Sequence, residues 1–590
     1  MTDTIRIGGA SGYWGESDMA WAQFLEGSGG DGAPELDVIV FDYLAEITMS
    51  IMAKMRSRDA NAGYAPDFVA NLSRWLPRVA ERGVKICSNA GGVNPVACAD
   101  AVRAAVKAAG LDLKVSVVTG DDLTGRLDRL ADNTEMFSGE GFPDAGTVQS
   151  ANAYLGAFPV AHALEAGADI VITGRCVDSA VTLGALIHRF GWTPQDVDLL
   201  AQGSLVGHLI ECGPQVTGGN FTDWRDVADS LVDIGYPIAE VSADGSCVIT
   251  KPDGTGGVVN RGTVAEQMLY EIGDPGAYHL PDVVCDFTQV EIEDLGGNRV
   301  RASGARGVGV PDTLKASVTV ADGHRLSAIF FMVGEDAQDK ARIFFDAAME
   351  RARRKLRAKN MPDYTHAELE LTGNGFHFGE NRPSDELAFR ISVRHEDAGA
   401  CTLMLKEASG FALAMPPGFA LFSGARPKPQ AVVRLFSTLV DKSVVDIAID
   451  GQAWEPPRVS VPLRDVSRET PAAPTLPTDT EVPLVELAWL RSGDKGDKSN
   501  IGVAARRPEF MPYIWAAVTE DAVRERFGHF VNGDIQRWYL PGSHSMNILM
   551  DEALGGGGMA SLRNDSQGKS FGQVLARMSI PVPSSLLSGG

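Results

Sequence analysis

Short apolar runs recur along the first 240 residues, and each gives way to a glycine-rich or polar turn and then to a helical pattern. The runs cover residues 5–7, 36–41, 83–88, 113–118 and 168–172. Apolar strands that alternate with helices are typical of a mostly parallel sheet with helices on its faces. The pattern therefore predicts a Rossmann-like α/β domain over residues 1–240.

The pattern changes near residue 241, where shorter β-rich runs alternate with glycine and proline turns. Residues 248–250, 283–287 and 314–320 are examples, and a charged amphipathic helix is expected over residues 336–359. This mixture predicts an α+β domain over residues 241–453. Recurring prolines over residues 454–483 resist packing and indicate an extended linker. Strand–helix–strand patterns then predict a small α+β domain over residues 484–590.

Composition narrows the class of protein. A chain of 590 residues is too long for one hydrophobic core, while 44% apolar and 22% charged residues are ordinary for a globular protein. A formal net charge of -24 argues against a nucleic-acid-binding surface. The seven cysteines form no C-x-x-C pair, so neither a zinc ribbon nor a disulfide framework is indicated. Without a leader or a membrane-length apolar run, we expect a cytoplasmic protein that does not bind membranes.

The predicted parallel sheet also predicts where a ligand binds, because ligands gather at the carboxyl ends of parallel strands. The loops there form one expected rim, made of Gly9, Ser11, Gly12, Asp42, Glu46, Asn89, Gly91, Gly92, Asp121, Arg175 and Asp178. The first loop, G-G-A-S-G-Y-W-G, lacks the dinucleotide fingerprint, so it predicts either an anion site or a plain tight turn. Asp178 is also well placed to cap a helix.

The segment 207–220, G-H-L-I-E-C-G-P-Q-V-T-G-G-N, concentrates reactive side chains. His208, Glu211 and Cys212 are residue types that perform acid–base or covalent catalysis, and with Asp178 they are the predicted catalytic residues. The turn Gly218, Gly219 and Asn220 offers backbone amides for an oxyanion. The alternative is a buried strand ending in a tight turn, with His208 as a satisfied core histidine.

Cations in the closing domain provide further candidates for ligand binding. Arg491 and Lys495 lie in the loop R-S-G-D-K-G-D-K-S-N and could meet a phosphate. Asp494 and Asp497 partly cancel their charge, so an interdomain salt-bridge network is an equal alternative.

Several long motifs together resemble a known family. They are F-D-Y-L-A-E-I-T-M-S, S-N-A-G-G-V-N-P, G-A-D-I-V-I-T-G-R-C-V-D-S-A, the segment 207–220 and L-Y-E-I-G-D-P. These runs look like the acyclic terpene utilisation (AtuA-like) family. The closing run R-S-G-D-K-G-D-K-S-N-I-G-V looks like the small ferredoxin-like domain that accompanies that family. The resemblance implies catabolism of branched, terpenoid-type acyl-CoA compounds, but it carries over no catalytic residue.

Three functional hypotheses follow. The first is a hydratase or carbon–carbon lyase acting on a (3-hydroxy)acyl-CoA thioester, with His208 or Glu211 as base, Cys212 as an alternative covalent group and Arg175 orienting an anionic group of the substrate. The second adds a divalent metal held by His208 and Glu211 with Asp42 or Asp178, although no metal-ligand set is assigned. The third is a non-catalytic accessory or assembly subunit of an acyl-CoA carboxylase-type complex. No cofactor is assigned, and a homo-oligomer is expected.

Overall fold

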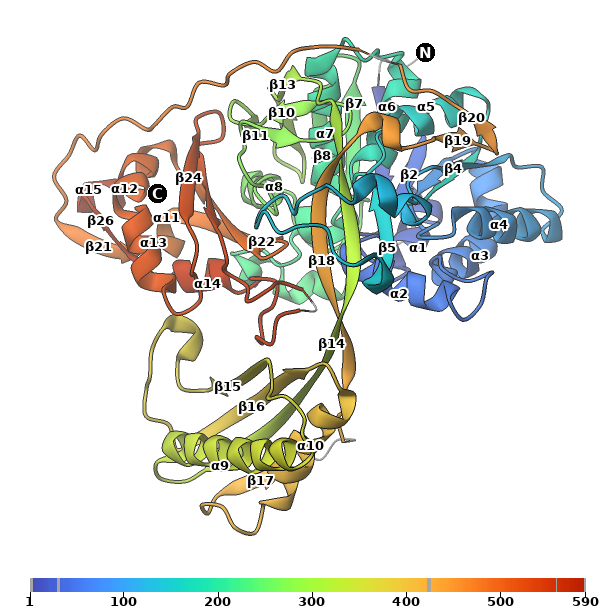
Figure 1. The fold of residues 1–590 in the computed structure, drawn as a ribbon. Helices are drawn as coiled ribbons and strands as arrows, with labels where there is room; N and C mark the ends of the chain where they lie inside the picture. The colour runs from blue at the N-terminus through green and yellow to red at the C-terminus, as the bar shows by residue number, and fades with distance from the viewer. Residues whose placement is uncertain (1–3, 29–31, 422–425, 458, 559, 588–590) are drawn as a thin grey trace.

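The computed structural model describes residues 4–28, 32–421, 426–457, 459–558 and 560–587. Figure 1 shows a large α/β body, a lobe that hangs below it on two long strands, and a small domain beside the body. A long extended linker crosses from the body to the small domain. The mixed α/β class expected from the sequence is confirmed.

The body is built on a sheet with a parallel centre. Its central strands lie in the order β1 (Thr4–Gly9), β2 (Val38–Phe41), β3 (Lys85–Ser88), β6 (Ile170–Thr173) and β4 (Val115–Thr119), and neighbours pair in parallel. These strands coincide with the five apolar runs of the sequence. Their carboxyl ends therefore meet at one edge of the sheet, as the alternating pattern requires.

Helices cover both faces of this sheet because alternate residues of each strand point to opposite sides. Val38 and Val40 join one hydrophobic core, whereas Ile39 and Phe41 join another. The first core contains α5 (Phe158–Glu165), α6 (Ala180–Phe190) and α7 (Val197–Ile210). The second contains α1 (Met19–Leu25), α2 (Glu46–Arg56), α3 (Pro66–Arg82) and α4 (Pro95–Ala108).

Antiparallel strands extend the sheet on both sides. Beyond β1 lie β7 (Ile238–Ser242), β8 (Cys247–Thr250), β12 (Val300–Ser303) and β11 (Glu291–Asp294); beyond β4 lie β19 (Ala448–Ile449) and β20 (Gln452–Ala453). The boundary expected at residues 240/241 thus falls inside β7. A short sheet of β9 (Tyr278–His279), β10 (Val284–Asp286) and β13 (Arg306–Gly309), together with α8 (Arg261–Met268), completes the body.

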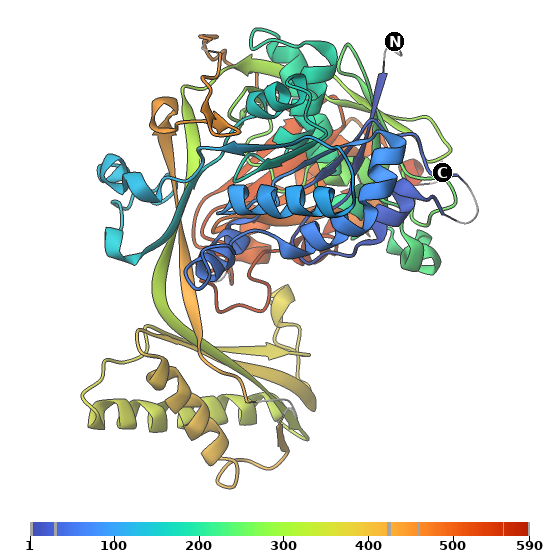
Figure 2. The ribbon, with the colours of Figure 1, turned by 90° about the vertical axis from the view of Figure 1, so that its right-hand side faces the viewer.

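One strand joins the body to the lobe. β14 (Thr313–Val333) is 21 residues long, and its first half pairs with β5 (Val148–Ala153) and β18 (Gln430–Asp441). Its second half enters the lobe, where it pairs with β16 (Glu386–His395) and β17 (Phe419–Leu421). Figure 2 shows β14 and β18 running side by side between the two parts.

The lobe consists of these strands with β15 (His366–Thr372) and two helices, α9 (Ala337–Ala358) and α10 (Ala398–Gly410). Phe330, Phe344 and Phe389 form its core between sheet and helices. Helix α9 confirms the charged amphipathic helix expected over residues 336–359.

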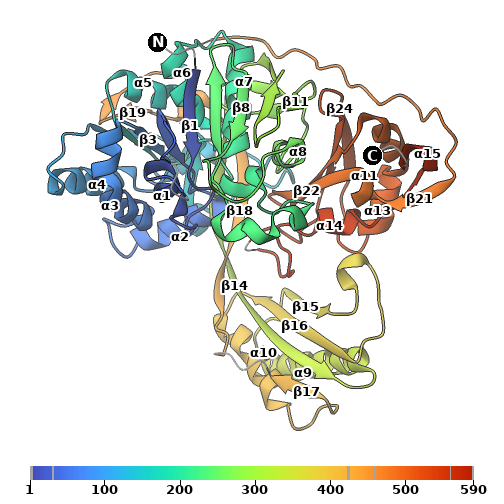
Figure 3. The same cartoon turned by 180° about the vertical axis from the view of Figure 1, so that it is seen from behind.

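The small domain has a four-stranded antiparallel sheet in the order β22 (Ala488–Lys495), β23 (Lys498–Ala505), β25 (Ser545–Met550) and β24 (Ile535–Leu540). Its helices are α11 (Leu484–Leu487), α12 (Met511–Ala517), α13 (Glu520–Phe527), α14 (Phe571–Leu575) and α15 (Ser584–Leu587). The last residues of the expected linker instead form β21 (Thr480–Pro483), because they pair with β26 (Ser579–Val582). Linker residues 459–479 form the long arc seen from behind in Figure 3.

Candidate functional site

A cleft of about 570 Å³ lies where the body, β14, β18 and the small domain meet. Its floor is formed by the loops that follow β2 and β6, which supply Leu44 and Asp178. An apolar wall comes from β18, including Val433 and Leu435. A further wall comes from the end of β22 and the turn that follows it, with Lys495 and Gly496. The cleft therefore opens at the carboxyl edge of the parallel strands, where the strand order predicts a ligand.

Three carboxyl groups meet at the floor of the cleft, and we call Asp42, Asp178 and Glu211 the carboxylate cluster. One carboxylate oxygen from each lies within 4.8 Å of the others. Asp42 follows β2, Asp178 follows β6 and Glu211 caps the end of α7. The side chain of Asp178 is 40% exposed and lines the cleft, whereas that of Glu211 is only 13% exposed.

Polar neighbours hold the carboxylate cluster in place. The Asn89 amide donates to Asp42 Oδ1 at 2.5 Å, and the Leu44 amide donates to the same oxygen at 3.2 Å. The buried Arg175 guanidinium donates to Asp178 Oδ1 at 3.0 Å and packs on the Tyr154 ring, 4.1 Å from its centroid. The predicted rim residues Asn89, Arg175 and Asp178 are thus brought together. The side chain of Glu46, also expected on this rim, lies outside the described residues.

The carboxylate cluster favours retaining a proton. Burial raises the pKa of Asp42 well above its usual range, and the charge of Asp178 adds to this effect against the lowering effect of Arg175. Burial also raises the pKa of Glu211, while His208 opposes that shift. Like charges at this separation disfavour full ionisation. The cluster can therefore offer both a proton donor and a proton acceptor to a ligand in the cleft.

His208 forms a hydrogen bond with Glu211 and fixes the position of its carboxyl group. Its Nδ1 lies 2.9 Å from Glu211 Oε1, and its Nε2 lies 3.2 Å from the carbonyl oxygen of Met268. A carbonyl only accepts, so Nε2 carries a hydrogen and Nδ1 shares a proton with Glu211. Burial acts to lower the pKa of His208, but the charge and hydrogen bond of Glu211 raise it overall. Since both ring nitrogens are engaged, this geometry orients Glu211 rather than presenting a base to the cleft.

The predicted catalytic thiol lies in an unfavourable environment for a nucleophile. Burial raises the pKa of Cys212 well above its ordinary value, and the charges of Glu211 and Glu271 raise it further. A thiol rather than a thiolate is therefore present at neutral pH, and only the thiolate is strongly nucleophilic.

The first glycine-rich loop packs against the end of α7. A Cβ added at Gly9 would lie 2.5 Å from the Ile210 carbonyl oxygen, and one at Gly12 would lie 2.8 Å from Cys212 Cα. The Gly12 amide already donates to Glu16 Oε2 at 2.6 Å, and the Ser11 hydroxyl donates to the Asp42 carbonyl. The loop thus forms a tight turn, which is one of the two alternatives that the sequence left open. The Gly12 amide, which could have bound an external anion, is occupied by the carboxylate of Glu16.

Two other predicted glycine sites also serve close backbone packing. A Cβ at Gly91 would lie 2.4 Å from the Thr173 carbonyl oxygen, and one at Gly92, whose φ is +54°, would lie 2.2 Å from Met52 Sδ. In the turn Gly218, Gly219 and Asn220, the amide of Gly218 donates to the Gln215 carbonyl and that of Gly219 to the Pro214 carbonyl. Those two amides are used within the turn, and none of the three residues lines the cleft.

Arg491 and Lys495 share one strand but have different surroundings. Arg491 is buried between the small domain and the body, where it pairs with Glu266 at 2.7 Å and donates to the Gly219 carbonyl. This arrangement confirms the salt-bridge alternative for Arg491. Lys495 lines the cleft, and its ammonium lies 5.1 Å from the centroid of the Tyr278 ring.

Several cleft residues were not among the predicted site residues. Tyr154 on the loop after β5 and Lys315 on β14 approach each other, with the Lys315 ammonium 4.8 Å from the ring centroid. Met136 and Phe137 project from a loop onto the cleft. Tyr278 had a signal, since it follows the unusual run L-Y-E-I-G-D-P. Lys315 also had a signal, since it ends the cationic run of residues 301–315. Tyr154, Met136 and Phe137 had none, because the pairing of β5 with β14 joins distant parts of the chain.

Comparison with known proteins gives two family matches. The model described as acyclic terpene utilisation family protein AtuA matches residues 5–450, and the model described as AtuA ferredoxin-like domain matches residues 482–581. No curated protein and no solved structure matches the chain. Among the helices that the structure describes, none has the length and apolarity needed to span a membrane. The matches confirm the resemblance drawn from the motifs and suggest a role in terpene catabolism.

Proposed function

Because the chain belongs to the acyclic terpene utilisation family, we propose that it is an enzyme of acyclic terpenoid catabolism acting on a branched acyl-CoA thioester. The observation that carries this proposal is the carboxylate cluster at the floor of a large, partly apolar cleft. Acid–base chemistry on a 3-hydroxyacyl thioester needs one group that gives a proton and one that takes it. We assign the reaction to the hydratase or carbon–carbon lyase class.

In this proposal Asp178 exchanges protons with the substrate, because it alone in the carboxylate cluster lines the cleft. Asp42 and Glu211 belong to the same cluster but do not line the cleft, and they accept or supply the other proton that each reaction moves. For dehydration, the base takes a proton from the carbon next to the thioester, the acid protonates the 3-hydroxyl, the C–O bond breaks and water leaves. For carbon–carbon cleavage, the base takes the hydroxyl proton, the bond between carbons 2 and 3 breaks, and the acid protonates the resulting enolate. Both reactions conserve protons within the cluster.

The rest of the cleft suits the other parts of such a substrate. Val433, Leu435 and Leu439 supply an apolar surface against which a branched chain can be buried. The thioester enolate gains negative charge in both reactions, and Lys495 lines the cleft near Tyr278 as a fixed cation. Arg175 serves to hold Asp178 in its position rather than to bind the substrate carbonyl.

The test replaces Asp178 by asparagine, which keeps the size of the side chain and removes its acid–base function. Asp100→Asn on α4 is the matched control, since its side chain is 66% exposed and lies outside the cleft lining. Conversion of branched 3-hydroxyacyl-CoA and enoyl-CoA esters is followed by mass spectrometry. We expect Asp178→Asn to lower kcat by about 10²- to 10⁴-fold and Asp100→Asn to leave it unchanged. Full turnover by Asp178→Asn would refute the assignment.

The carboxylate cluster also favours a second candidate, a lyase assisted by a divalent metal. Among the described residues it is the group of acidic, histidine or cysteine side chains whose ligand atoms converge closely enough to hold an ion. Carboxylate oxygens suit hard cations such as Mg²⁺ or Mn²⁺, which would polarise the thioester carbonyl. Elemental analysis of the purified protein, with activity measured after chelation and after adding back each cation, separates this candidate from metal-free acid–base chemistry.

The accessory-subunit alternative is tested separately. It expects acyl-CoA carboxylase-type partners to copurify with the full chain and expects no turnover of any acyl-CoA ester. Size-exclusion chromatography of the same sample tests the expected homo-oligomer.

A further inference from the structure

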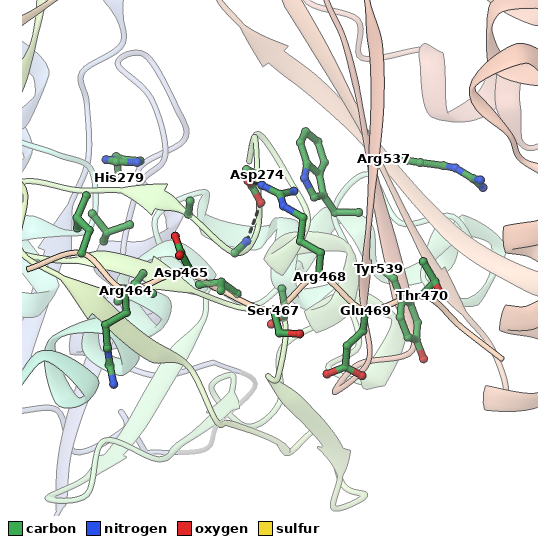
Figure 4. Close-up of a pocket in the computed structure, with 18 of the residues that line it drawn as sticks. Asp274, His279, Arg464, Asp465, Ser467, Arg468, Glu469, Thr470, Arg537 and Tyr539 are labelled. Carbon is green, nitrogen blue, oxygen red and sulfur yellow. Dashed lines mark hydrogen bonds and ion pairs between the residues drawn. The ribbon is translucent and has the colours of Figure 1, made fainter.

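A second cavity lies beneath the linker, outside the carboxylate cluster. It has a volume of about 460 Å³, within the range of small-molecule sites. Linker residues 463–470 form one side, β9 and the loop before it form another, and β24 of the small domain forms the third. We call it the linker cavity; Figure 4 shows it in close-up.

The linker cavity adjoins the cleft. Asp274, Ala277 and His279 line both spaces, so this short segment is the partition between them. A ligand that occupies both spaces would have to pass this segment. A coenzyme A thioester has this two-ended form, with an acyl chain at one end and a nucleotide at the other.

The lining combines aromatic rings with a held guanidinium. Trp515, Trp538 and Tyr539 come from α12 and β24, and Trp515 and Tyr539 lie with their ring centroids 6.2 Å apart. The Arg468 guanidinium from the linker pairs with Asp274 at 2.5 Å and lies 5.9 Å from the Trp538 ring centroid. Its side chain is 63% exposed, and Figure 4 shows it reaching toward Asp274.

Backbone hydrogen bonds attach the linker to the body beside the linker cavity. The Val310 amide donates to the Val461 carbonyl at 3.0 Å, and the Arg464 amide donates to the Val308 carbonyl at 2.8 Å. On the other side, β24 is the edge strand of its sheet, so it pairs with one neighbour among the described strands. The linker side of the cavity is thus held by backbone hydrogen bonds to the body, which favours a preformed site.

We propose that the linker cavity binds the nucleotide end of the coenzyme A thioester, an assignment that rests on the proposed function. An adenine ring has a face that stacks on indole or phenol rings, and Arg468 offers a planar fork for a phosphate. Ser467 and Thr470 on the same stretch of linker add hydroxyl donors. Arg537 is not assigned to the phosphate, because it is committed to Glu520 and to the carbonyl oxygens of Trp515 and Val518.

The linker cavity carries equal numbers of positively and negatively charged side chains, and this balance affects how a phosphate can bind. The lining carries three guanidinium groups, from Arg464, Arg468 and Arg537, and three carboxylates, from Asp274, Asp465 and Glu469. A phosphate therefore has to share or replace the contact between Asp274 and Arg468. Affinity for the nucleotide fragment should consequently fall as salt concentration rises.

The experiment uses the full chain and adenosine 3′,5′-bisphosphate, the nucleotide fragment of coenzyme A, with binding measured by isothermal titration calorimetry. Trp538→Ala and Arg468→Ala probe the linker cavity. Trp224→Ala and Arg301→Ala are matched controls, because these side chains are partly exposed and line neither cavity nor cleft. We expect saturable binding to the unmodified protein, at least tenfold weaker binding in each cavity variant, and changes below twofold in the controls.

Absence of saturable binding, or wild-type affinity in either cavity variant, overturns the proposal. Failure of the proposed function gives a different pattern: no acyl-CoA ester is converted while the bisphosphate still binds and still responds to Trp538→Ala. A substrate lacking the nucleotide, such as an N-acetylcysteamine thioester, gives a further check. Its kcat/KM should be unaffected by Trp538→Ala, whereas that of the coenzyme A thioester should fall at least tenfold.

Discussion

Replacing Glu266 by glutamine tests whether a buried ion pair holds the small domain against the body. Glu266 and Arg491 have side chains only 0% and 5% exposed, and they come from opposite sides of the interface. Glutamine keeps the shape but leaves the guanidinium buried without its counter-charge. Removing one partner of such a pair typically costs about 3–5 kcal/mol.

Amide hydrogen exchange is the suitable assay, because two amides are protected by the opposite part of the molecule. The Leu490 amide donates to Thr222 Oγ1 at 2.9 Å, and the Glu271 amide donates to Asn500 Oδ1 at 3.0 Å. These amides exchange when the small domain separates. With about 1.4 kcal/mol per tenfold change, the loss corresponds to exchange roughly 10²- to 10⁴-fold faster.

Two further variants serve as a surface control and as a test of charge compensation. Glu293→Gln breaks a surface pair with Arg301, whose side chains are 59% and 47% exposed, and should cost less than about 1 kcal/mol. The double variant Glu266→Gln/Arg491→Met removes both charges and should recover much of the lost protection. If exchange at Leu490 and Glu271 in Glu266→Gln stays within threefold of wild type, the pair does not hold the domains together.

Three other predictions follow from the site. Because the folded-state pKa of His208 is raised, its stabilisation is fully present below about pH 6.5 and is lost as pH rises through that raised value; the Tm difference between wild type and His208→Gln should therefore be larger at about pH 5.5 than at about pH 9. Gly12→Ala places a Cβ 2.8 Å from Cys212 Cα and should destabilise the protein by about 1–3 kcal/mol in thermal unfolding, whereas Gly410→Ala, with nothing within 4 Å, should be neutral. Cys212→Ala should keep turnover within about threefold, because its raised pKa leaves little thiolate; loss of all activity would contradict this reading.

The gathering of Asp42, Asn89, Arg175 and Asp178 follows from the sequence because it depends on local rules. Apolar runs locate the strands, and parallel order brings their carboxyl ends to one edge. The roles of Gly9, Gly12 and Gly91 could not be read in the same way. A glycine that allows close approach of a ligand and one that allows close approach of another backbone look identical until the opposing chain is known.

Arg491 and Lys495 also show that the sequence does not reveal which part of the protein lies opposite a residue. Their even spacing puts them on one face of β22, roughly 13 Å apart. The sequence indicates that shared face but not what lies opposite each residue. Arg491 forms an ion pair with Glu266, whereas Lys495 lines the cleft. The apolar wall was unpredictable for a related reason, since β5, β14 and β18 pair across more than a hundred residues of chain.

That same pairing bears on how the protein is made. β14 emerges from the ribosome before the strands that cover it, because β16 and β18 end only at His395 and Asp441. At ~5–20 residues per second, the last of these partners follows β14 by roughly 5–20 s. Until β16 has been synthesised, roughly 3–12 s after β14 at that rate, this 21-residue strand, apolar along much of its length, has only β5 available as a neighbour among the described strands. Synthesis of the nascent chain therefore exposes an aggregation-prone edge, which slower translation would prolong and a ribosome-associated chaperone would shield.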